Sequence, residues 1–156
     1  MADHYTQTSF MIPTKTDEQK AWLLDVLGQL DEVQSETMEP SDVKDEIIAV
    51  ATEHHYDFEA MYTPYYCSEK EGVWIRSDES IDVDLMIVVI QAYLRKFHPN
   101  SFMGFQWAET CSEPRLDEFG GGAVYISADD FEAHSTGRWL WDQFKEASAG
   151  GGEQLE

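Results

Sequence analysis

The chain has 156 residues, of which 42% are hydrophobic and 13% are aromatic, so it can form one folded domain with its own core and is not a disordered chain. Thirty-one Asp and Glu outnumber ten Lys and Arg, which gives a formal net charge of −21. Such a surface repels DNA, RNA and anionic lipid, so we expect neither direct nucleic-acid binding nor membrane binding. The same charge attracts basic proteins and speeds encounters with them.

No stretch of the chain reaches the roughly 20 apolar residues that a membrane-spanning helix needs. Residues 1–5 have neither the basic region nor the apolar region of a secretory signal. We therefore expect a cytoplasmic protein, in which Cys67 and Cys111 stay reduced. Two cysteines are too few for a disulfide framework and have no metal-ligand spacing, so we predict thiols in or near the core and no cofactor.

The first predicted elements are a strand and a helix. Residues 5–13 read as a strand that ends at a proline, which cannot donate to a strand ladder. Thr16 and Gln19 have the spacing of a capping box, and apolar residues then recur at helical spacing, which predicts a helix over 17–33. These apolar residues are Leu23, Val26, Leu27, Leu30 and Val33.

A polar connector and a second helix follow. Residues 34–42 contain proline, serine and acids, which break the helical pattern. Ser41 can cap a second helix, which we expect to end near His54 and His55. Histidines at a helix C-terminus are stabilised by the helix dipole.

The middle of the chain predicts a hairpin and a buried helix. Residues 56–63 alternate strictly in direction, which is typical of a half-buried strand. Residues 68–72 have turn chemistry, and 72–77 return as the partner strand. Residues 81–97 are rich in β-branched side chains, but their length and helical period favour a helix that is buried on nearly all sides.

Two more strands are predicted towards the C-terminus. Residues 101–109 form one, and 123–127 form the other directly after a triple glycine. Ser127 and Asp130 suggest that a short turn of helix follows.

A final helical segment and a tail end the chain. Thr136 can cap the segment 137–147, and residues 148–156 lack core side chains. We therefore predict a single domain over 1–147 and a flexible tail over 148–156. The expected fold is α+β: a two-layer sandwich with a mainly antiparallel sheet of four to five strands and helices on one face, in a ferredoxin-like order (β-α-β-β-α-β) with additions.

The segment 111–122 is the most unusual part of the sequence. The glycines at 120–122 precede a strand, whereas a phosphate-binding loop leads into a helix N-terminus, so we interpret them as a mobile loop or a bulge. Such glycines adopt positive φ or pass close to another element. Arg115 lies between Glu113 and Asp117, so it either pins the loop by a salt bridge or contacts an anion or a partner. The predicted loop-contact residues are Arg115, Asp117, Gly120, Gly121 and Gly122.

The sequence contains no recognisable catalytic or metal-binding constellation. Cys111 would need a nearby base and a lowered pKa to act as a nucleophile, but the acids around it raise the pKa of a thiol. His54, His55 and Asp57 could supply metal ligands, but adjacent histidines point to different sides and no further motif completes the set. Acids are so frequent that a pair of them does not identify an acid–base couple. We therefore predict no catalytic residue and no metal site.

Acidic residues gather between the first two predicted helices. Seven of them fall within residues 31–46, a stretch that contains one lysine, Lys44. Such a run is often only solvated, but it can also present carboxylates to a basic partner in imitation of nucleic-acid phosphates. The predicted partner-binding residues, named the acidic belt below, are Asp31, Glu32, Glu36, Glu39, Asp42, Asp45 and Glu46.

Three hypotheses for the function follow. The leading one is a non-enzymatic acidic binding protein, namely an inhibitor, immunity or phage counter-defence protein that docks on a basic, nucleic-acid-binding protein surface. The second is a small enzyme or an anion- or metabolite-binding domain that uses the 111–122 loop. The third is an acidic housekeeping domain from a salt-loving organism, whose acids serve solvation. The sequence makes no prediction of the oligomeric state.

The segment 107–130, together with 72–79, resembles a family of uncharacterised bacterial proteins. In that family a Cys-x-x-Pro-Arg-x-Asp-x-aromatic-Gly-Gly-Gly-Ala stretch precedes the last strand. The resemblance implies no activity. The residues that match the pattern are Cys111, Pro114, Arg115, Asp117, Phe119, Gly120, Gly121, Gly122 and Ala123.

Overall fold

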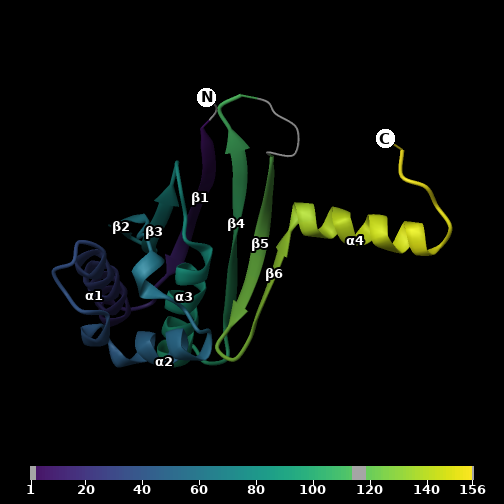
Figure 1. The fold of residues 1–156 in the computed structure, drawn as a ribbon. Helices are drawn as coiled ribbons and strands as arrows, with labels where there is room; N and C mark the ends of the chain where they lie inside the picture. The colour runs from purple at the N-terminus through teal and green to yellow at the C-terminus, as the bar shows by residue number, and fades with distance from the viewer. Residues whose placement is uncertain (1–2, 114–118, 156) are drawn as a thin grey trace.

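The computed structural model describes residues 3–113 and 119–155, and shows a twisted sheet with helices against it (Figure 1). The strands are β1 (His4–Pro13), β2 (Tyr65–Glu69), β3 (Gly72–Ser77), β4 (Phe102–Cys111), β5 (Gly120–Ser127) and β6 (Phe131–Ser135). The helices are α1 (Asp17–Gln34), α2 (Asp45–Glu53), α3 (Val83–Phe97) and α4 (Thr136–Ala149), with short 3₁₀ turns at Pro40–Asp42 and Phe58–Ala60.

The six strands form one open antiparallel sheet in the order β2-β3-β1-β4-β5-β6. The α+β class is therefore confirmed, but the sheet has six strands where the sequence predicted four to five. The additional strand is β6, in a place where we expected a short turn of helix. The backbone N–H of Ser127 instead donates to the carbonyl of Asp130, which closes a hairpin between β5 and β6.

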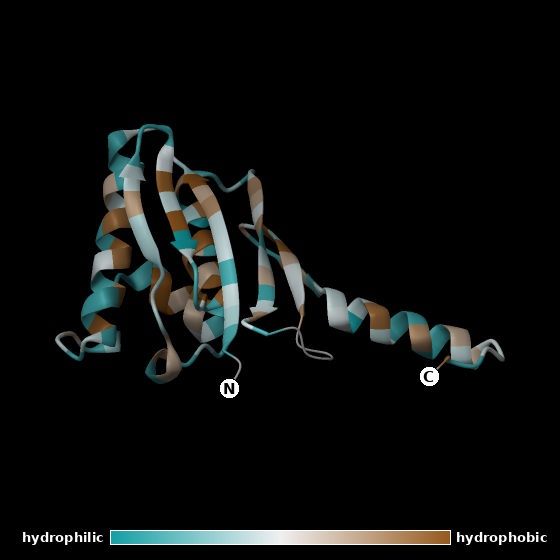
Figure 2. Cartoon of the chain, turned by 90° about the horizontal axis from the view of Figure 1, so that it is seen from above, coloured by the Kyte–Doolittle hydropathy of each residue, from teal (hydrophilic) through white to brown (hydrophobic). Residues whose placement is uncertain are grey.

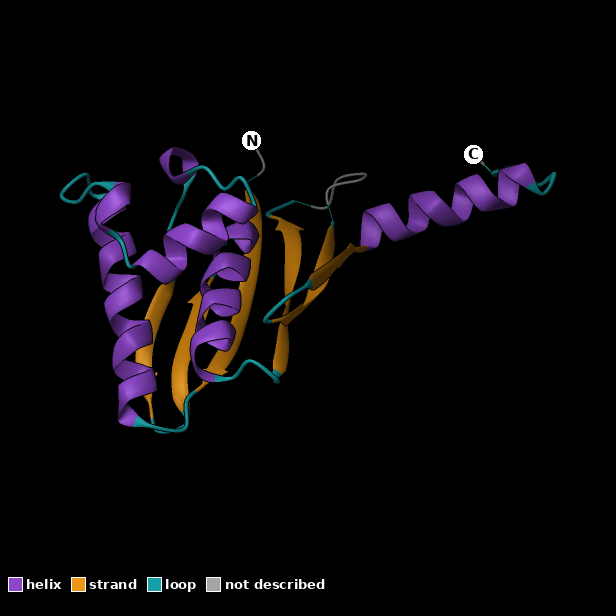
Figure 3. Ribbon diagram, turned by 90° about the horizontal axis from the view of Figure 1, so that it is seen from below, coloured by secondary structure: helices purple, strands orange, loops and turns teal. Residues whose placement is uncertain are grey.

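Three helices cover one face of the sheet (Figure 3). The sheet contributes Ile12, Ile75, Val124 and other alternating apolar side chains to the core between the two layers. All ten residues from Leu85 to Leu94 of α3 are buried, which confirms the prediction of a helix buried on nearly all sides.

The predicted strand over 56–63 is wrong. Asp57 accepts a hydrogen bond from the backbone N–H of Glu59 and caps a 3₁₀ turn, and the strand of the hairpin begins only at Tyr65. The alternating tyrosines of this segment are held by their hydroxyl groups, since that of Tyr62 donates to the carbonyl of Ile81. The alternating pattern of this segment therefore does not come from a pleated strand, because Tyr56 and Tyr62 are each held by a hydrogen bond from the hydroxyl group.

Helix starts agree with the sequence in one case and differ in two. Thr16 caps α1 by accepting from the backbone N–H of Gln19, as predicted. Ser41 does not cap α2, because that helix begins at Asp45 and its N-cap makes no side-chain hydrogen bond. The last helix is capped by Ser135, one residue before the predicted Thr136.

Helix α4 lies apart from the other helices and extends away from the sheet (Figures 1 and 2). None of its 14 residues is buried. Its apolar side chains therefore contribute little to the core.

Candidate functional site

The acidic belt follows the chain from the last turns of α1 through the connector to the first turn of α2. Five of its side chains are exposed, while Asp31 and Glu46 are half-buried. The carboxylate of Asp31 accepts hydrogen bonds from Tyr66 Oη at 3.0 Å and Thr63 Oγ1 at 2.6 Å, and Glu46 pairs with Lys96 Nζ at 3.2 Å. Within the part of the chain that the structure describes, no ion pair neutralises the exposed five, which are Glu32, Glu36, Glu39, Asp42 and Asp45.

Local structure explains why acids are tolerated in the belt. Glu36 has a φ of 61°, so the chain reverses sharply after α1 and turns this side chain outward. Asp45 and Glu46 occupy the first turn of α2, where the helix dipole favours negative charge. A hydrogen bond from the backbone of Glu46 lowers the pKa of its carboxyl, and Lys96 lowers it further.

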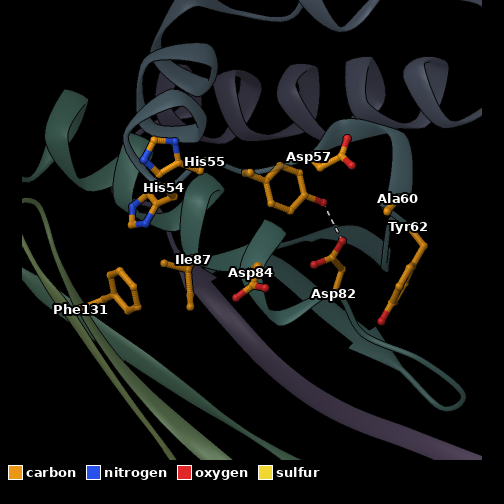
Figure 4. Close-up of a pocket in the computed structure, with 10 residues that line it drawn as sticks. His54, His55, Asp57, Ala60, Tyr62, Asp82, Asp84, Ile87 and Phe131 are labelled. Carbon is orange, nitrogen blue, oxygen red and sulfur yellow. Dashed lines mark hydrogen bonds between the residues drawn. The ribbon is translucent and has the colours of Figure 1, made fainter.

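A pocket of about 410 Å³ lies beyond the other end of α2 (Figure 4). Its walls come from the end of α2, the 3₁₀ turn that follows, the start of α3 and strand β6. Among the described residues that line it, none is Lys or Arg. The lining residues are His54, His55, Tyr56, Asp57, Ala60, Tyr62, Asp82, Asp84, Ile87 and Phe131.

The tyrosines of the pocket are hydrogen-bond donors rather than bases. Tyr56 Oη donates to Asp82 Oδ2 at 2.6 Å, and burial, with Asp82 second, raises the pKa of Tyr56 far above its ordinary value of 10.0. Burial also raises the pKa of Tyr62. Both phenols therefore stay protonated at neutral pH.

The carboxylates of the pocket differ in their hydrogen bonding and in their exposure to solvent. Asp82 accepts from Tyr56 and also from the backbone N–H of Leu85, so it serves as the N-cap of α3. Asp84, in the first turn of α3, is exposed. Carboxylates beside aromatic rings are the environment that Arg and Lys side chains prefer, through charge-assisted hydrogen bonds and contact with the ring face.

A second hollow joins the pocket to the acidic belt. It has about 480 Å³, shares Tyr62 with the first pocket and also contains Asp31 of the belt. Asp78 and Glu79 line it as well. Carboxylates thus follow one another from the belt to the pocket of Figure 4. The sequence predicted the belt but not this continuation, because its acids belong to three separate segments.

The predicted histidine pair lies at the C-terminus of α2, as expected. His54 Nε2 donates to Gln91 Oε1 at 2.7 Å, because the amide oxygen can only accept, and its ring lies 5.0 Å from that of Phe131. His55 has a φ of 54° and its side chain is exposed. Within residues 3–113 and 119–155 no three His, Cys, Asp or Glu side chains converge to hold a metal ion.

The triple glycine is part of strand β5 rather than of a loop or bulge. None of these glycines has a positive φ, so the predicted loop or bulge at residues 120–122 is wrong. The expected close approach is present, because a Cβ on Gly122 would meet the ring of Trp107 and lie 2.6 Å from the carbonyl oxygen of His134. The other two predicted loop contacts, Arg115 and Asp117, lie outside the described residues.

Neither cysteine forms a disulfide, and both are half-buried. Burial and the neighbouring Glu69 raise the pKa of Cys67, whose thiol donates to Glu69 Oε1 at 3.4 Å. Cys111 lies opposite His4 in the β1–β4 ladder, a proximity that the sequence did not indicate because 107 residues separate the two.

No protein-family model matches the chain, and neither a curated protein nor a solved structure does. The resemblance carried by Cys111 to Ala123 therefore stays a prediction. Within the described residues, no helix is long and apolar enough to cross a lipid bilayer.

Proposed function

We propose that this chain is an acidic, non-enzymatic binding protein that docks on a basic surface of another protein. The observation that carries the proposal is the continuity of carboxylates from the exposed belt, past Asp31 and Tyr62, to the pocket beside Asp84. Acids that serve only solvation can be scattered over the surface. Acids grouped around two adjoining hollows can instead bind cationic side chains that enter the hollows.

The two parts of this surface act at different distances. The belt attracts a basic partner over about 10 Å at moderate salt and raises the rate of encounter. The pocket then accepts an Arg or Lys side chain, whose charge lies beside Asp57 and Asp84 and whose stem packs on the tyrosine rings.

The partner class follows from the sign and grouping of the charge. A protein surface that binds nucleic-acid phosphates is rich in Arg and Lys and therefore complements the belt. An inhibitor, immunity or phage counter-defence protein that occupies such a surface imitates the nucleic acid and competes with it. Such binding requires no cofactor and neither forms nor breaks a covalent bond.

We also propose that β1 to β4, with α1 and α3, form the ferredoxin-like arrangement that the sequence predicted. The order β2-β3-β1-β4 and the antiparallel pairing support it, with α2, β5, β6 and α4 as additions. This likeness carries no function.

The proposal is tested with a fluorescent arginine-rich peptide of about nine residues as the basic probe. We expect the protein to bind it at about 0.05 M NaCl and to lose most of that affinity at about 0.5 M, because screening weakens exposed charge pairs. Replacing three exposed belt residues, Glu32→Gln, Glu36→Gln and Glu39→Gln, should weaken binding about tenfold in an anisotropy titration.

A control variant with the same change of net charge is Asp129→Asn, Glu146→Gln and Glu153→Gln, three exposed acids outside the belt. We expect it to retain affinity within about twofold. A duplex DNA oligonucleotide should compete with the protein for the peptide. Equal losses in both triple variants would mean that only net charge matters, and the proposal of a specific surface would then fail.

A further inference from the structure

Helix α4 presents an apolar stripe that is largely exposed in the part of the chain that the structure describes. Leu140 and Trp141 are neighbours, and Phe144 and Ala147 follow at spacings of three or four, so the four share one side of the helix. Leu140 is 45% exposed and Trp141 is 58% exposed. Figure 2 shows apolar bands along α4, which extends away from the other helices.

An apolar groove lies beside the base of this helix. It has about 450 Å³ and lies between β4, the start of β5, the end of β6 and the first turns of α4. Trp107, Gly121, Gly122 and Trp139, which is 58% exposed, are among the residues that line it. A side chain at Gly122 would collide with the ring of Trp107, so the glycine lets this ring lie beside the groove.

The apolar stripe and the apolar groove are complementary in polarity, and each copy of the chain carries both. An isologous interface uses the same patch on both copies, so a stripe and a groove at one end of the molecule can each be used twice. Edge strand β6 adds unpaired backbone groups at the same place.

Local charge favours a second copy over a basic partner here. Residues 136–149 contain Arg138, Asp142, Lys145 and Glu146, so the helix carries no net charge in a chain of −21. A basic partner is attracted to the belt and not to this helix. Since α4 extends away from the sheet, two copies can meet along it while their acidic bodies stay apart (Figure 1).

The exposed area of α4 is large enough for a stable dimer only if each copy contributes both its stripe and its groove. Trp139 and Trp141 leave roughly 100–150 Å² each uncovered, judged from their size and exposure, and Leu140 and the half-buried Phe144 leave less. One helix therefore buries about 300–400 Å² on its own side. When each copy also contributes its groove, the area approaches the roughly 800 Å² per partner of a stable interface.

We infer that a second copy of this chain covers α4: the apolar stripe of each copy packs over the Trp107–Gly122 groove of the other. The acidic docking surface lies on other elements except for Phe131 at the start of β6, and none of its carboxylates lines this groove.

Sedimentation velocity at about 50 μM protein and about 0.5 M NaCl tests the inference. We expect a mass of twice the 17.9 kDa of one chain. The double variant Trp141→Ser with Phe144→Ser should sediment as a monomer, with dimerisation weakened by at least about tenfold. Because α4 buries none of its residues, these changes should leave the circular dichroism spectrum and Tm of the body intact.

A matched control is Phe102→Ser, which removes a 69% exposed aromatic ring at the other end of β4 and should leave the dimer unchanged. Hydrogen exchange supplies a second readout, since amides of α4 should become more protected as protein concentration rises. A monomeric wild-type chain at about 100 μM would overturn the inference, as would a dimer that persists in the double variant.

Discussion

Gln91 is a polar side chain, 1% exposed, within the most buried helix of the protein. Its amide nitrogen donates to the carbonyls of Ser127, at 3.1 Å, and Asp130, while its oxygen accepts from His54. It therefore joins α2, α3 and the β5–β6 turn, and the hairpin that carries α4 is positioned partly through this one residue.

Replacing Gln91 by Met keeps the volume but removes the hydrogen bonds to the carbonyls of Ser127 and Asp130 and from the ring of His54. The carbonyl of Asp130 still accepts from the backbone N–H of Ser127. We expect a loss of about 2 kcal/mol in the free energy of unfolding, which lowers Tm by roughly 6 °C for a domain of this size. Thermal unfolding by circular dichroism measures it. Gln106→Met, at an exposed position of β4, is the control and should change Tm little. An unchanged Tm for Gln91→Met would show that these hydrogen bonds do not matter.

The raised pKa of Tyr93 predicts how the free energy of unfolding changes at alkaline pH. Its hydroxyl donates to the carbonyl of Pro13 at 2.7 Å, and burial raises its pKa to about 12 from 10.0. The unfolded chain therefore loses this proton at a lower pH than the folded chain. The contribution of Tyr93 to stability is thus constant below pH 10 and is lost between about pH 10 and 12.

Urea unfolding at about pH 9 and pH 11.5 measures this fall. In Tyr93→Phe we expect a shallower decline, by up to about 1.4 kcal/mol per pH unit, because one titrating group is gone. Tyr125→Phe, an exposed tyrosine, is the control. Parallel curves for wild type and Tyr93→Phe would contradict the assignment.

Some residue roles could be predicted from the sequence and others could not. The acids of the belt and the cap at Thr16 follow from local patterns, and both could be predicted. The bonds of Gln91 and the proximity of His4 to Cys111 depend on partners 36 to 107 residues away, so no local pattern contains them.

At the scale of elements, period and length predicted α1 and α3 well, because their apolar side chains recur every three or four residues over four turns or more. The errors fell on short segments. Residues 56–63 alternate like a strand but are held as a 3₁₀ turn by Asp57 and by tyrosine hydroxyls. Strand β6 has five residues and no buried side chain, so it lacks the apolar alternation that identifies a strand.

The glycines of β5 lead to a prediction about that strand. Gly122→Ala places a methyl group against the Trp107 ring and 2.6 Å from the carbonyl oxygen of His134, so the strand or the indole must move. We expect a loss of about 1–3 kcal/mol, measured by urea unfolding. Gly137→Ala in α4 has nothing within 4 Å and should not lower stability. If Gly122→Ala is also neutral, the close packing of β4 on β5 is not required.

At the scale of the whole molecule, the net charge of −21 opposes the compact state through self-repulsion. We expect Tm to rise by several degrees between about 0.02 M and 0.5 M NaCl, because the Debye length falls from about 20 Å to about 4 Å. The triple belt variant Glu32→Gln, Glu36→Gln and Glu39→Gln should show a smaller rise. A Tm independent of salt would contradict this.

The same titration separates the binding protein from an acidic domain of a salt-loving organism. We expect the protein to be folded at about 0.02 M NaCl, because the helical layer and the sheet enclose an apolar core. Unfolding on removal of salt would instead favour the halophilic hypothesis.

The most direct test of the central claim is to map where a basic ligand binds. In a ¹H–¹⁵N NMR titration with the arginine-rich peptide at low salt, we predict shifts that cluster at residues 31–46 and around Asp57, Tyr62 and Asp84. They should disappear at about 0.5 M NaCl. Shifts spread evenly over all acidic residues, or confined to α4, would contradict the proposal that the belt and the pocket form the docking surface.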